Sequence, residues 1–264
     1  MGVTKTKHFK RKQWITQAAS MLLIGLMFGY FSASASAARG VSSEAGSEGI
    51  AQTAYSPDNG QGPVIIVISG QTGPASYQSY AAELSRLGYY SVLVAGNDIL
   101  NPEHTGPTNL RKTIERALQS PSAVKGKVAV IGFSLGGGGA LYNAANLPNL
   151  VSVVVAYYPY TKTWANKIDL LVSHFQVPVL VLAAQRDRYK DCCVIETAHA
   201  MEAAAKAKGA RFELVVYPEA DHGFNLKTGA TGEPMGAYRG DDDRDAWSRT
   251  VNMLKLYHPL PLEG

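Results

Sequence analysis

Residues Val128–Ala140, with the sequence VAVIGFSLGGGGA, decide the fold of this chain. The run begins with four small or β-branched apolar residues, which predicts a buried strand. The residues that follow the glycines, Ala140–Ala145, have a helical pattern. Because Gly-x-Ser-x-Gly lies between strand and helix, it predicts a sharp turn that exposes the Ser134 hydroxyl. Gly132 and Gly136 lack Cβ atoms, so the strand and the helix can approach each other closely.

The same glycine run could instead bind phosphate, but two known kinds of phosphate loop do not match it. A Walker-type loop ends in Gly-Lys-Ser/Thr, and no lysine follows the glycines at positions 136–139. A dinucleotide loop needs Gly-x-Gly-x-x-Gly, and Phe133, Ser134 and Leu135 interrupt the first glycine pair. A nucleophilic serine is therefore the favoured interpretation, provided that an acid and a histidine follow in that order.

Residues 1–37 predict an export signal. A basic head (Lys5, Lys7, Lys10, Arg11 and Lys12) precedes the apolar stretch Met21–Phe31, and small residues up to Ala37 offer a cleavage site. The apolar stretch has eleven residues, whereas a membrane span needs about 20. We therefore expect cleavage and a secreted or periplasmic protein without stable membrane insertion, with an uncleaved anchor as the alternative. Residues 38–60 are expected to form a flexible leader, and residues 61–264 a single domain.

The net positive charge of the chain comes from this predicted signal. The whole sequence has 25 basic and 21 acidic residues, and the signal holds five of the basic ones. The mature chain would therefore carry a net charge of −1, which gives no reason to expect a nucleic acid or an anionic membrane as partner.

Cys192 and Cys193 are adjacent and are the only cysteines. Export permits disulfides, but a bond between neighbours would distort the backbone at a predicted helix start, so we expect two buried thiols. No metal site is predicted, because no second Cys or His pair completes a ligand set. Asp241–Asp243 lacks the spaced oxygen ligands of a calcium loop and is interpreted as a solvated approach to a helix.

Apolar runs alternate with helical patterns along the rest of the chain. This alternation predicts an α/β fold, with a mostly parallel, doubly wound sheet that has helices on both faces. In such sheets, ligands bind beyond the carboxyl ends of the strands. The expected strands are 64–69, 90–95, 128–131, 151–157, 179–183 and 212–216, and the expected helices are 76–87, 109–119, 140–145, 194–208 and 244–256.

Three residues with complementary chemistry follow the ends of separate predicted strands. A serine hydroxyl needs a base, and His222 can take the proton of Ser134. Asp187 can orient the imidazole and stabilise its cation. Asp191 is a rival for the acid, whereas Asp221 adjoins His222 and would have to bend back onto its ring. The remaining histidines are expected to be ordinary surface or core residues: His8, His104, His174, His199 and His258.

The substrate side of the site is predicted from the same strand ends. The backbone N–H groups of Leu135 and Gln71 are expected to form an oxyanion hole, in which each donor is typically worth about 3 kcal/mol of transition-state stabilisation. The expected substrate pocket is formed by Gln71, Thr72, Asn97, Tyr158 and Trp164. A packing role for Trp164 is an equal alternative.

The sequence resembles the dienelactone hydrolase family of α/β-hydrolases from about Val64 to Leu256. The resemblance is most specific in GFSLGG at 132–137, QRDR at 185–188 and YPEADHGF at 217–224. It implies a compact α/β-hydrolase fold without a large lid, a small ester or lactone as substrate, and no cofactor. It also implies that the nucleophile, acid and base are Ser134, Asp187 and His222.

Two departures from the family pattern affect the expected substrate. The founding members have a cysteine nucleophile and a glutamate in the first loop, where this chain has Ser134 and Gln71. Both differences favour a general serine esterase that forms an acyl-enzyme. The glycine run and the first loop also resemble bacterial cutinases and polyester hydrolases, where an aromatic residue lines the acyl pocket as Trp164 could. The alternatives are such a cutinase-like esterase, a serine peptidase and a catalytically silent binding protein on the same fold.

Overall fold

The computed structural model describes residues 41–44, 49–229, 231–233 and 235–261. The chain divides into two units, Met1–Ala35 and Ser36–Gly264, and all described residues belong to the second. The predicted export signal, residues 1–37, lies outside the described residues, so its cleavage and the destination of the chain stay predictions.

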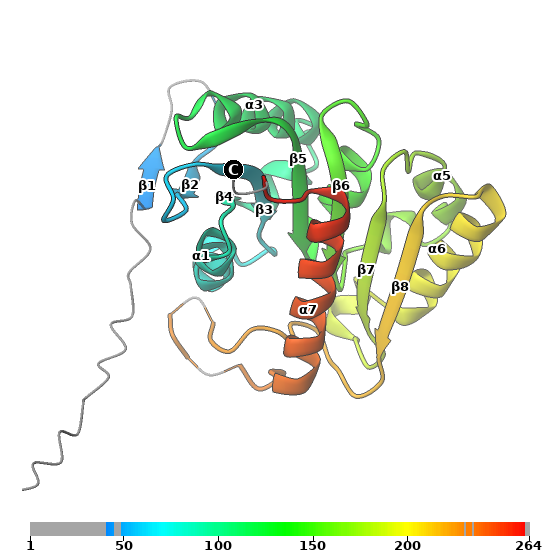
Figure 1. Cartoon of the computed structure of the whole chain (residues 1–264). Helices are drawn as coiled ribbons and strands as arrows, with labels where there is room; N and C mark the ends of the chain where they lie inside the picture. Colours follow the sequence, from blue (N-terminus) through cyan, green and yellow to red (C-terminus); the bar gives the residue numbers. More distant parts are fainter. Residues whose placement is uncertain (1–40, 45–48, 230, 234, 262–264) are drawn as a thin grey trace, which may run out of the picture. The chain divides into compact units, whose positions relative to one another are not determined.

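An eight-stranded sheet forms the centre of the described part, in the order β1-β2-β4-β3-β5-β6-β7-β8 (Figure 1). Strands β3 to β8 pair in parallel, and β1 and β2 add an antiparallel edge. This arrangement confirms the predicted fold class. The strands are β1 Val41–Glu44, β2 Gln52–Tyr55, β3 Gly62–Ile68, β4 Tyr90–Val94, β5 Ala123–Phe133, β6 Val151–Tyr157, β7 Val179–Ala184 and β8 Phe212–Tyr217.

The register of the parallel strands brings their carboxyl ends to one edge. Ile68 of β3 lies opposite Gly132 of β5, and Phe133 lies opposite Tyr157 of β6. At the far side, Ala184 of β7 lies opposite Tyr217 of β8. The loops that leave these strands therefore begin side by side, which is the geometry that lets distant sequence segments share one site.

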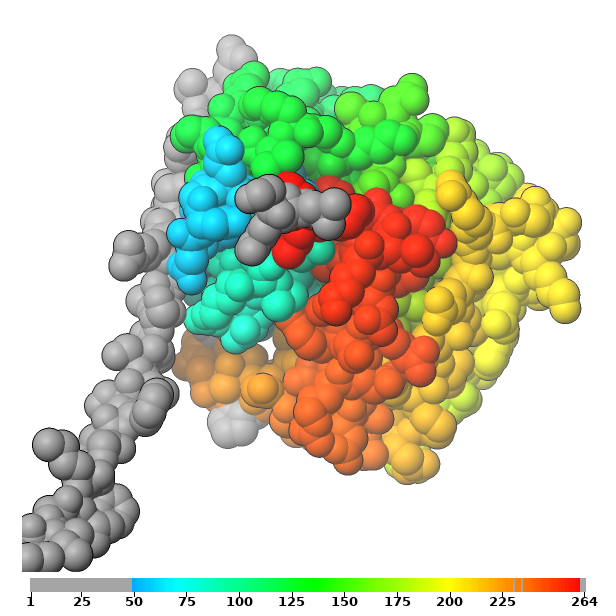
Figure 2. Space-filling view, viewed as in Figure 1, coloured from blue at the N-terminus to red at the C-terminus, as the bar shows by residue number. Residues whose placement is uncertain are grey.

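Helices cover both faces of the sheet, as the strand–helix alternation predicts. Helices α1 (Gln78–Arg86) and α7 (Gly240–Tyr257) cover one face, where their buried side chains belong to the same core cluster as Ile65 and Val67. Figure 2 shows both helices on the surface of that side. On the other face, the core includes side chains of α3, α5 and α6. The remaining α-helices are α2 Gly96–Ile99, α3 Gly106–Gln119, α4 Leu135–Gly139, α5 Ile168–Ser173 and α6 Ile195–Lys208.

Several boundaries follow directly from local sequence signals. Strand β6 has the predicted bounds, and α6 ends at Lys208 and is capped by Gly209, which adopts the left-handed conformation expected of a helix cap. The glycine run forms α4 and continues as a π-helical turn, Ala140–Ala144, rather than as a regular α-helix. No described helix has both the length and the apolar character that a membrane span requires, and no large lid is present in the described part of the chain.

The predicted flexible leader differs from the structure. Residues 41–44 and 52–55 fall within the segment 38–60, yet they form β1 and β2, and β2 pairs with β4. Short edge strands depend on backbone hydrogen bonds to a neighbouring strand. Sequence periodicity gives little sign of such strands, because four mixed polar and apolar residues do not form a clear pattern.

His258 is an ordinary core histidine, as predicted. It follows α7 and is buried, with Nδ1 3.1 Å from Ser152 Oγ and the ring stacked on Tyr89. Burial lowers the pKa of His258 from 6.5 to about 4, because the cation would lose its hydration. The neutral imidazole is therefore the form that the fold accommodates.

This shift predicts that stability falls as the pH is lowered from about 6.5 to 4. Over that range the unfolded chain binds a proton at His258 and the folded chain does not, so protonation favours unfolding. The full contribution below pH 4 is about 3 kcal/mol. Urea unfolding of wild type and His258→Gln between pH 4.5 and 7.5 measures it, and the variant should have a flatter profile. Equal profiles would contradict the assignment, and the exposed His199→Gln is the control.

Candidate active site

Ser134 occupies a strained turn at the carboxyl end of β5. Its backbone has φ 50° and ψ −115°, which a non-glycine residue rarely adopts. Three hydrogen bonds hold it: Ser134 N–H donates to the Tyr157 carbonyl at 3.0 Å, and the Ser134 carbonyl accepts from Tyr160 at 2.8 Å and Gly138 at 3.0 Å. The strain is therefore fixed by β6, by the segment after it and by α4, as expected of a turn that presents a functional side chain.

Glycines on both sides of Ser134 make this turn possible. A Cβ at Gly132 would overlap the Gly136 carbonyl, and a Cβ at Gly136 would overlap the carbonyl oxygens of Ile68 and Ser69. The obstructing atoms are backbone, so they cannot move aside as a flexible side chain could. The close approach predicted from Gly132 and Gly136 is present.

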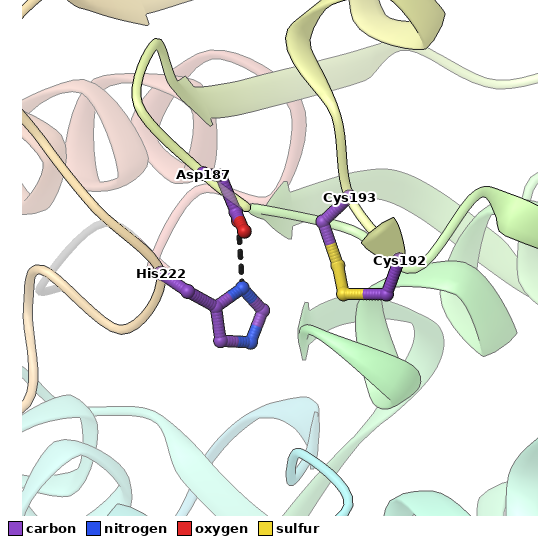
Figure 3. Close-up of side chains that lie close together, drawn as sticks. All are labelled: Asp187, Cys192, Cys193 and His222. Atoms are coloured by element: carbon purple, nitrogen blue, oxygen red, sulfur yellow. Dashed lines mark hydrogen bonds and ion pairs between the residues drawn. A yellow bond between two sulfur atoms is a disulfide. The ribbon is translucent and has the colours of Figure 1, made fainter. Parts of the chain in front are cut away.

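The structure brings Ser134, His222 and Asp187 into one hydrogen-bonded chain. His222 Nε2 lies 2.9 Å from Ser134 Oγ, and His222 Nδ1 lies 2.7 Å from Asp187 Oδ2 (Figure 3 shows the second pair). A carboxylate can only accept, so Nδ1 carries the proton and the neutral ring has its lone pair on Nε2. The ring is thus oriented to accept the Ser134 proton.

The Asp187 carboxylate is fully buried and has two partners. Its Oδ2 accepts from His222, and its Oδ1 accepts the Tyr189 backbone N–H at 3.0 Å. A buried carboxylate is tolerated when hydrogen bonds replace its hydration. Asp191 is exposed on the loop beyond, and neither Asp191 nor Asp221 has a hydrogen bond to His222 among the described residues.

Backbone contacts join the loops that carry the acid and the histidine. Gln185 N–H donates to the Tyr217 carbonyl, and Arg186 N–H donates to the Ala220 carbonyl, both at 3.0 Å. An exposed ion pair between Arg186 and Glu219 connects the same loops. Because the loops are bonded to each other directly, the Asp187–His222 distance depends little on the exposed ion pair.

Two tyrosines fix the plane of the His222 ring. Tyr189 stacks on it with centroids 4.7 Å apart, and Tyr158 meets it edge to face at the same separation. The buried Tyr158 hydroxyl donates to Asn225 Oδ1 at 2.7 Å. Burial raises the pKa of Tyr158 well above its ordinary value, so the hydroxyl stays protonated and can donate. No sequence pattern predicted the contribution of Tyr189.

A cavity of about 740 Å³ opens beside Ser134. Of the predicted pocket residues, Gln71, Asn97 and Trp164 line it. Trp164 also packs into the core and against Tyr142, so the packing role is present, and its role in an acyl pocket stays a prediction. Further residues line the cavity that the sequence analysis did not identify, including Leu100, Asn101, Tyr142, Tyr160, Lys162, Tyr189 and Lys190.

Two predicted pocket residues do not line this cavity. Thr72 is exposed in the loop after β3, and Tyr158 is buried beneath the His222 ring. The prediction for Tyr158 failed because its backbone, with φ 34°, turns away from the extended strand path just after β6. The alternation of a strand therefore does not continue through Tyr158.

The backbone donors predicted for an oxyanion hole lie at the same edge. Leu135 is the first residue of α4, and both Leu135 and Gln71 line the cavity beside Ser134. Among the described residues, neither of these two N–H groups donates a hydrogen bond. Both are therefore free to donate to a bound oxygen atom.

The cysteines differ from the prediction of two free thiols. Cys192 and Cys193 are joined by a disulfide, and both are buried. The prediction assumed that a helix starts at the cysteines, whereas α6 begins only at Ile195, and Lys190 and Asp191 before them both have φ 51°. Cys192 also lines the cavity beside Ser134.

The strand order, the strained serine turn and the Ser–His–Asp chain define the chain as a protein of the α/β-hydrolase fold. The model of the dienelactone hydrolase family matches residues 95–258. The chain therefore belongs to the dienelactone hydrolase family, as the sequence motifs predicted.

The curated relatives share only about half of their length with this chain, at 28–30% identity. A Yersinia pestis protein provisionally named a carboxymethylenebutenolidase is 30% identical over 146 residues, or 52% of this chain and 51% of that protein. Protein usf of Aquifex pyrophilus is 28% identical over 134 residues, or 50% of this chain and 52% of that protein. The chain thus spans about half the length of the curated relatives it matches.

A solved structure from Klebsiella pneumoniae, provisionally titled a dienelactone hydrolase, has the same fold. Its TM-score is 0.64 at 22% identity, with 79% of this chain and 93% of that chain covered. At this identity, the likeness supports the fold alone.

The glycine packing yields a stability prediction. Gly136→Ala should lower the free energy of unfolding by about 1–3 kcal/mol, because the new methyl group would have to displace backbone atoms at the end of β3. Gly236→Ala is the matched control, since a Cβ there would meet nothing within 4 Å. Chemical denaturation of both variants measures the difference, and equal stability would contradict the close-packing account.

Proposed function

We propose that this chain hydrolyses carboxylic esters or lactones through an acyl-enzyme on Ser134. The observation that carries the proposal is the hydrogen-bonded chain from Ser134 Oγ through His222 to the buried Asp187. Membership of the dienelactone hydrolase family supports hydrolysis as the reaction class. A silent binding protein would not need a serine held in a strained turn within 2.9 Å of an imidazole.

The first step is attack by Ser134 Oγ on the ester carbonyl carbon. His222 Nε2 takes the hydroxyl proton as the new bond forms. Asp187 stabilises the resulting imidazolium through the hydrogen bond to Nδ1. The substrate oxygen, which now carries a negative charge, accepts hydrogen bonds from the backbone N–H groups of Leu135 and Gln71.

Collapse of the tetrahedral intermediate expels the alcohol, which takes the proton from His222. A water molecule then attacks the acyl-enzyme, with His222 as its general base, and releases the acid and the Ser134 hydroxyl. For a lactone, the alcohol is part of the acyl group, so it stays attached in the acyl-enzyme and the second step releases a single hydroxy acid. His222 Nε2 takes up and returns the proton in both steps. The proposed reaction therefore uses only side chains and backbone groups of this chain, without a cofactor.

The cavity supports a small ester with an aromatic or apolar part. Its volume of about 740 Å³ is within the usual range for small-molecule sites. Tyr142, Tyr160 and Trp164 provide aromatic walls, and the amides of Gln71 and Asn97 lie near the reaction centre. Asn97 Nδ2 donates to the Gln71 carbonyl at 3.1 Å, which orients the loop that carries the predicted oxyanion donor.

The destination of the chain is also a proposal. We propose export, supported by the basic head, apolar stretch and small residues within 1–37. The disulfide between Cys192 and Cys193 is compatible with an oxidising compartment. The mass of the chain purified from a secreting host tests this, because cleavage after Ala37 would remove the first 37 residues.

Ser134→Ala should abolish hydrolysis of p-nitrophenyl acetate while the fold is kept. Loss of the nucleophile should lower kcat by about 10⁴–10⁶-fold. Initial rates under saturating substrate measure the change, and circular dichroism checks the fold. Turnover close to wild type would remove Ser134 from its proposed role.

Asp187→Asn tests the orientation of the imidazole. An amide can donate to Nδ1, which would leave the proton on Nε2 and remove the base that Ser134 needs. The expected loss in kcat is about 10⁴-fold, with KM much less affected. Asp191→Asn, on the same loop but exposed, is the matched control. Equal losses in the two variants would show that Asp187 has no special role.

A further inference from the structure

Four potential metal ligands cluster beside the cavity: Asp187, Cys192, Cys193 and His222. One ligand atom from each lies within 4.8 Å of all the others. Asp187 and both cysteines are buried, and the His222 side chain is 17% exposed. Figure 3 shows the disulfide next to the Asp187–His222 pair. The proposed reaction uses the carboxylate and the imidazole but assigns nothing to the two sulfur atoms.

We propose that reduction of the Cys192–Cys193 disulfide converts this cluster into a zinc site that switches off hydrolysis. A dithiol donor supplies two electrons and two protons, the S–S bond breaks, two thiols form, and the donor leaves as a disulfide. Each thiol then gives its proton to solvent as it binds the metal. The loss of activity rests on the proposed function, whereas metal binding does not.

The ligand set suits Zn²⁺. Thiolate, imidazole and carboxylate are its usual protein ligands, and four of them complete a tetrahedral site. Zinc–ligand distances of about 2.0–2.3 Å place the ligand atoms of a tetrahedral site roughly 3.3–3.8 Å apart. The four ligand atoms already lie within 4.8 Å of one another, so only small movements would bring them to these separations. Two thiolates also favour zinc over magnesium or calcium, which prefer oxygen.

The sulfur atoms should remain at the site after the disulfide opens. The Cys192 carbonyl accepts the Thr161 N–H at 2.8 Å and the Lys162 N–H at 3.0 Å. These bonds fix the backbone to the segment after β6 independently of the sulfur–sulfur bond. An ion can reach the cluster through the cavity, because Cys192 and Ser134 both line it.

Zinc at this cluster excludes the proposed catalysis, whichever imidazole nitrogen it binds. Bound to Nε2, the metal takes the lone pair that would accept the Ser134 proton. Bound to Nδ1, it replaces the hydrogen bond to Asp187, and the ring proton moves to Nε2. His222 cannot act as a base for Ser134 in either case.

Metal binding is tested on the full chain with Co²⁺ and Zn²⁺ alone. A water-soluble phosphine, which becomes the phosphine oxide with oxygen from water, reduces the disulfide and is removed under nitrogen. Reduced protein should bind one equivalent of Co²⁺ with a thiolate-to-metal charge-transfer band. Titration calorimetry should show Zn²⁺ binding about 100-fold or more tighter than to the oxidised protein. Equal affinity in both redox states, or no thiolate band, would overturn the proposal.

Variants separate this site from adventitious binding and from the proposed hydrolase. Cys192→Ser/Cys193→Ser should lose the band, whereas His199→Ala, which removes the exposed His199–Glu202 pair, should keep it. If the double variant fails to fold, oxidised wild type replaces it as the control, because its cysteines are joined and should give no thiolate band. Ser134→Ala should bind Co²⁺ like wild type, because Ser134 is not a ligand. A band that survives in the double variant would overturn the site.

Activity provides the second readout. Zn²⁺ should inhibit ester hydrolysis by the reduced protein about 100-fold more potently than by the oxidised protein, and a chelator should restore the rate. Inhibition independent of redox state would contradict the switch. If the oxidised protein hydrolyses no ester, the proposed function fails, while the Co²⁺ band still decides the metal site.

Discussion

The structure depends on one strained residue, Ser134, held with positive φ between β5 and α4. An isolated turn would relax from this conformation, because most side chains avoid that region. Here the end of β6, the segment after it and α4 bond both backbone groups of Ser134, and Gly136 packs directly on the backbone at the end of β3. The sheet therefore supplies the energy that keeps the hydroxyl at its carboxyl edge, so the reactivity proposed for Ser134 depends on the packing of the whole core.

The same edge also holds the residues that complete the site. Because β7 and β8 are in register, the loops that carry Asp187 and His222 begin side by side and bond to each other. Tyr189 stacks on the imidazole from the loop that continues into the disulfide. The redox state of Cys192 and Cys193 is thus placed where it can affect the proposed base, although neither sulfur takes part in the proposed hydrolysis. An acyl-transfer site and a soft-metal site would share two side chains and exclude each other.

Much of this arrangement is predictable from sequence because it rests on strong local signals. Long β-branched runs mark the buried strands, Gly209 marks the end of α6, and Ser134, Asp187 and His222 each follow a strand end. Other features depend on contacts that no local pattern records. The edge strands β1 and β2 are short and of mixed polarity. Tyr158 leaves the strand path by one backbone rotation, and positive φ at Lys190 and Asp191 allows a disulfide where a helix start was expected. Tyr189 and Tyr142 line the cavity together only because the fold brings distant segments of the chain to one place.

The central claim is that His222 makes the Ser134 hydroxyl nucleophilic, and covalent labelling with a fluorophosphonate tests it most directly. The account predicts one phosphonyl group per chain, located at Ser134 by mass spectrometry of the digested protein. It also predicts that His222→Ala lowers the labelling rate by several orders of magnitude. Labelling of another residue, or no labelling of folded wild type, would contradict the account.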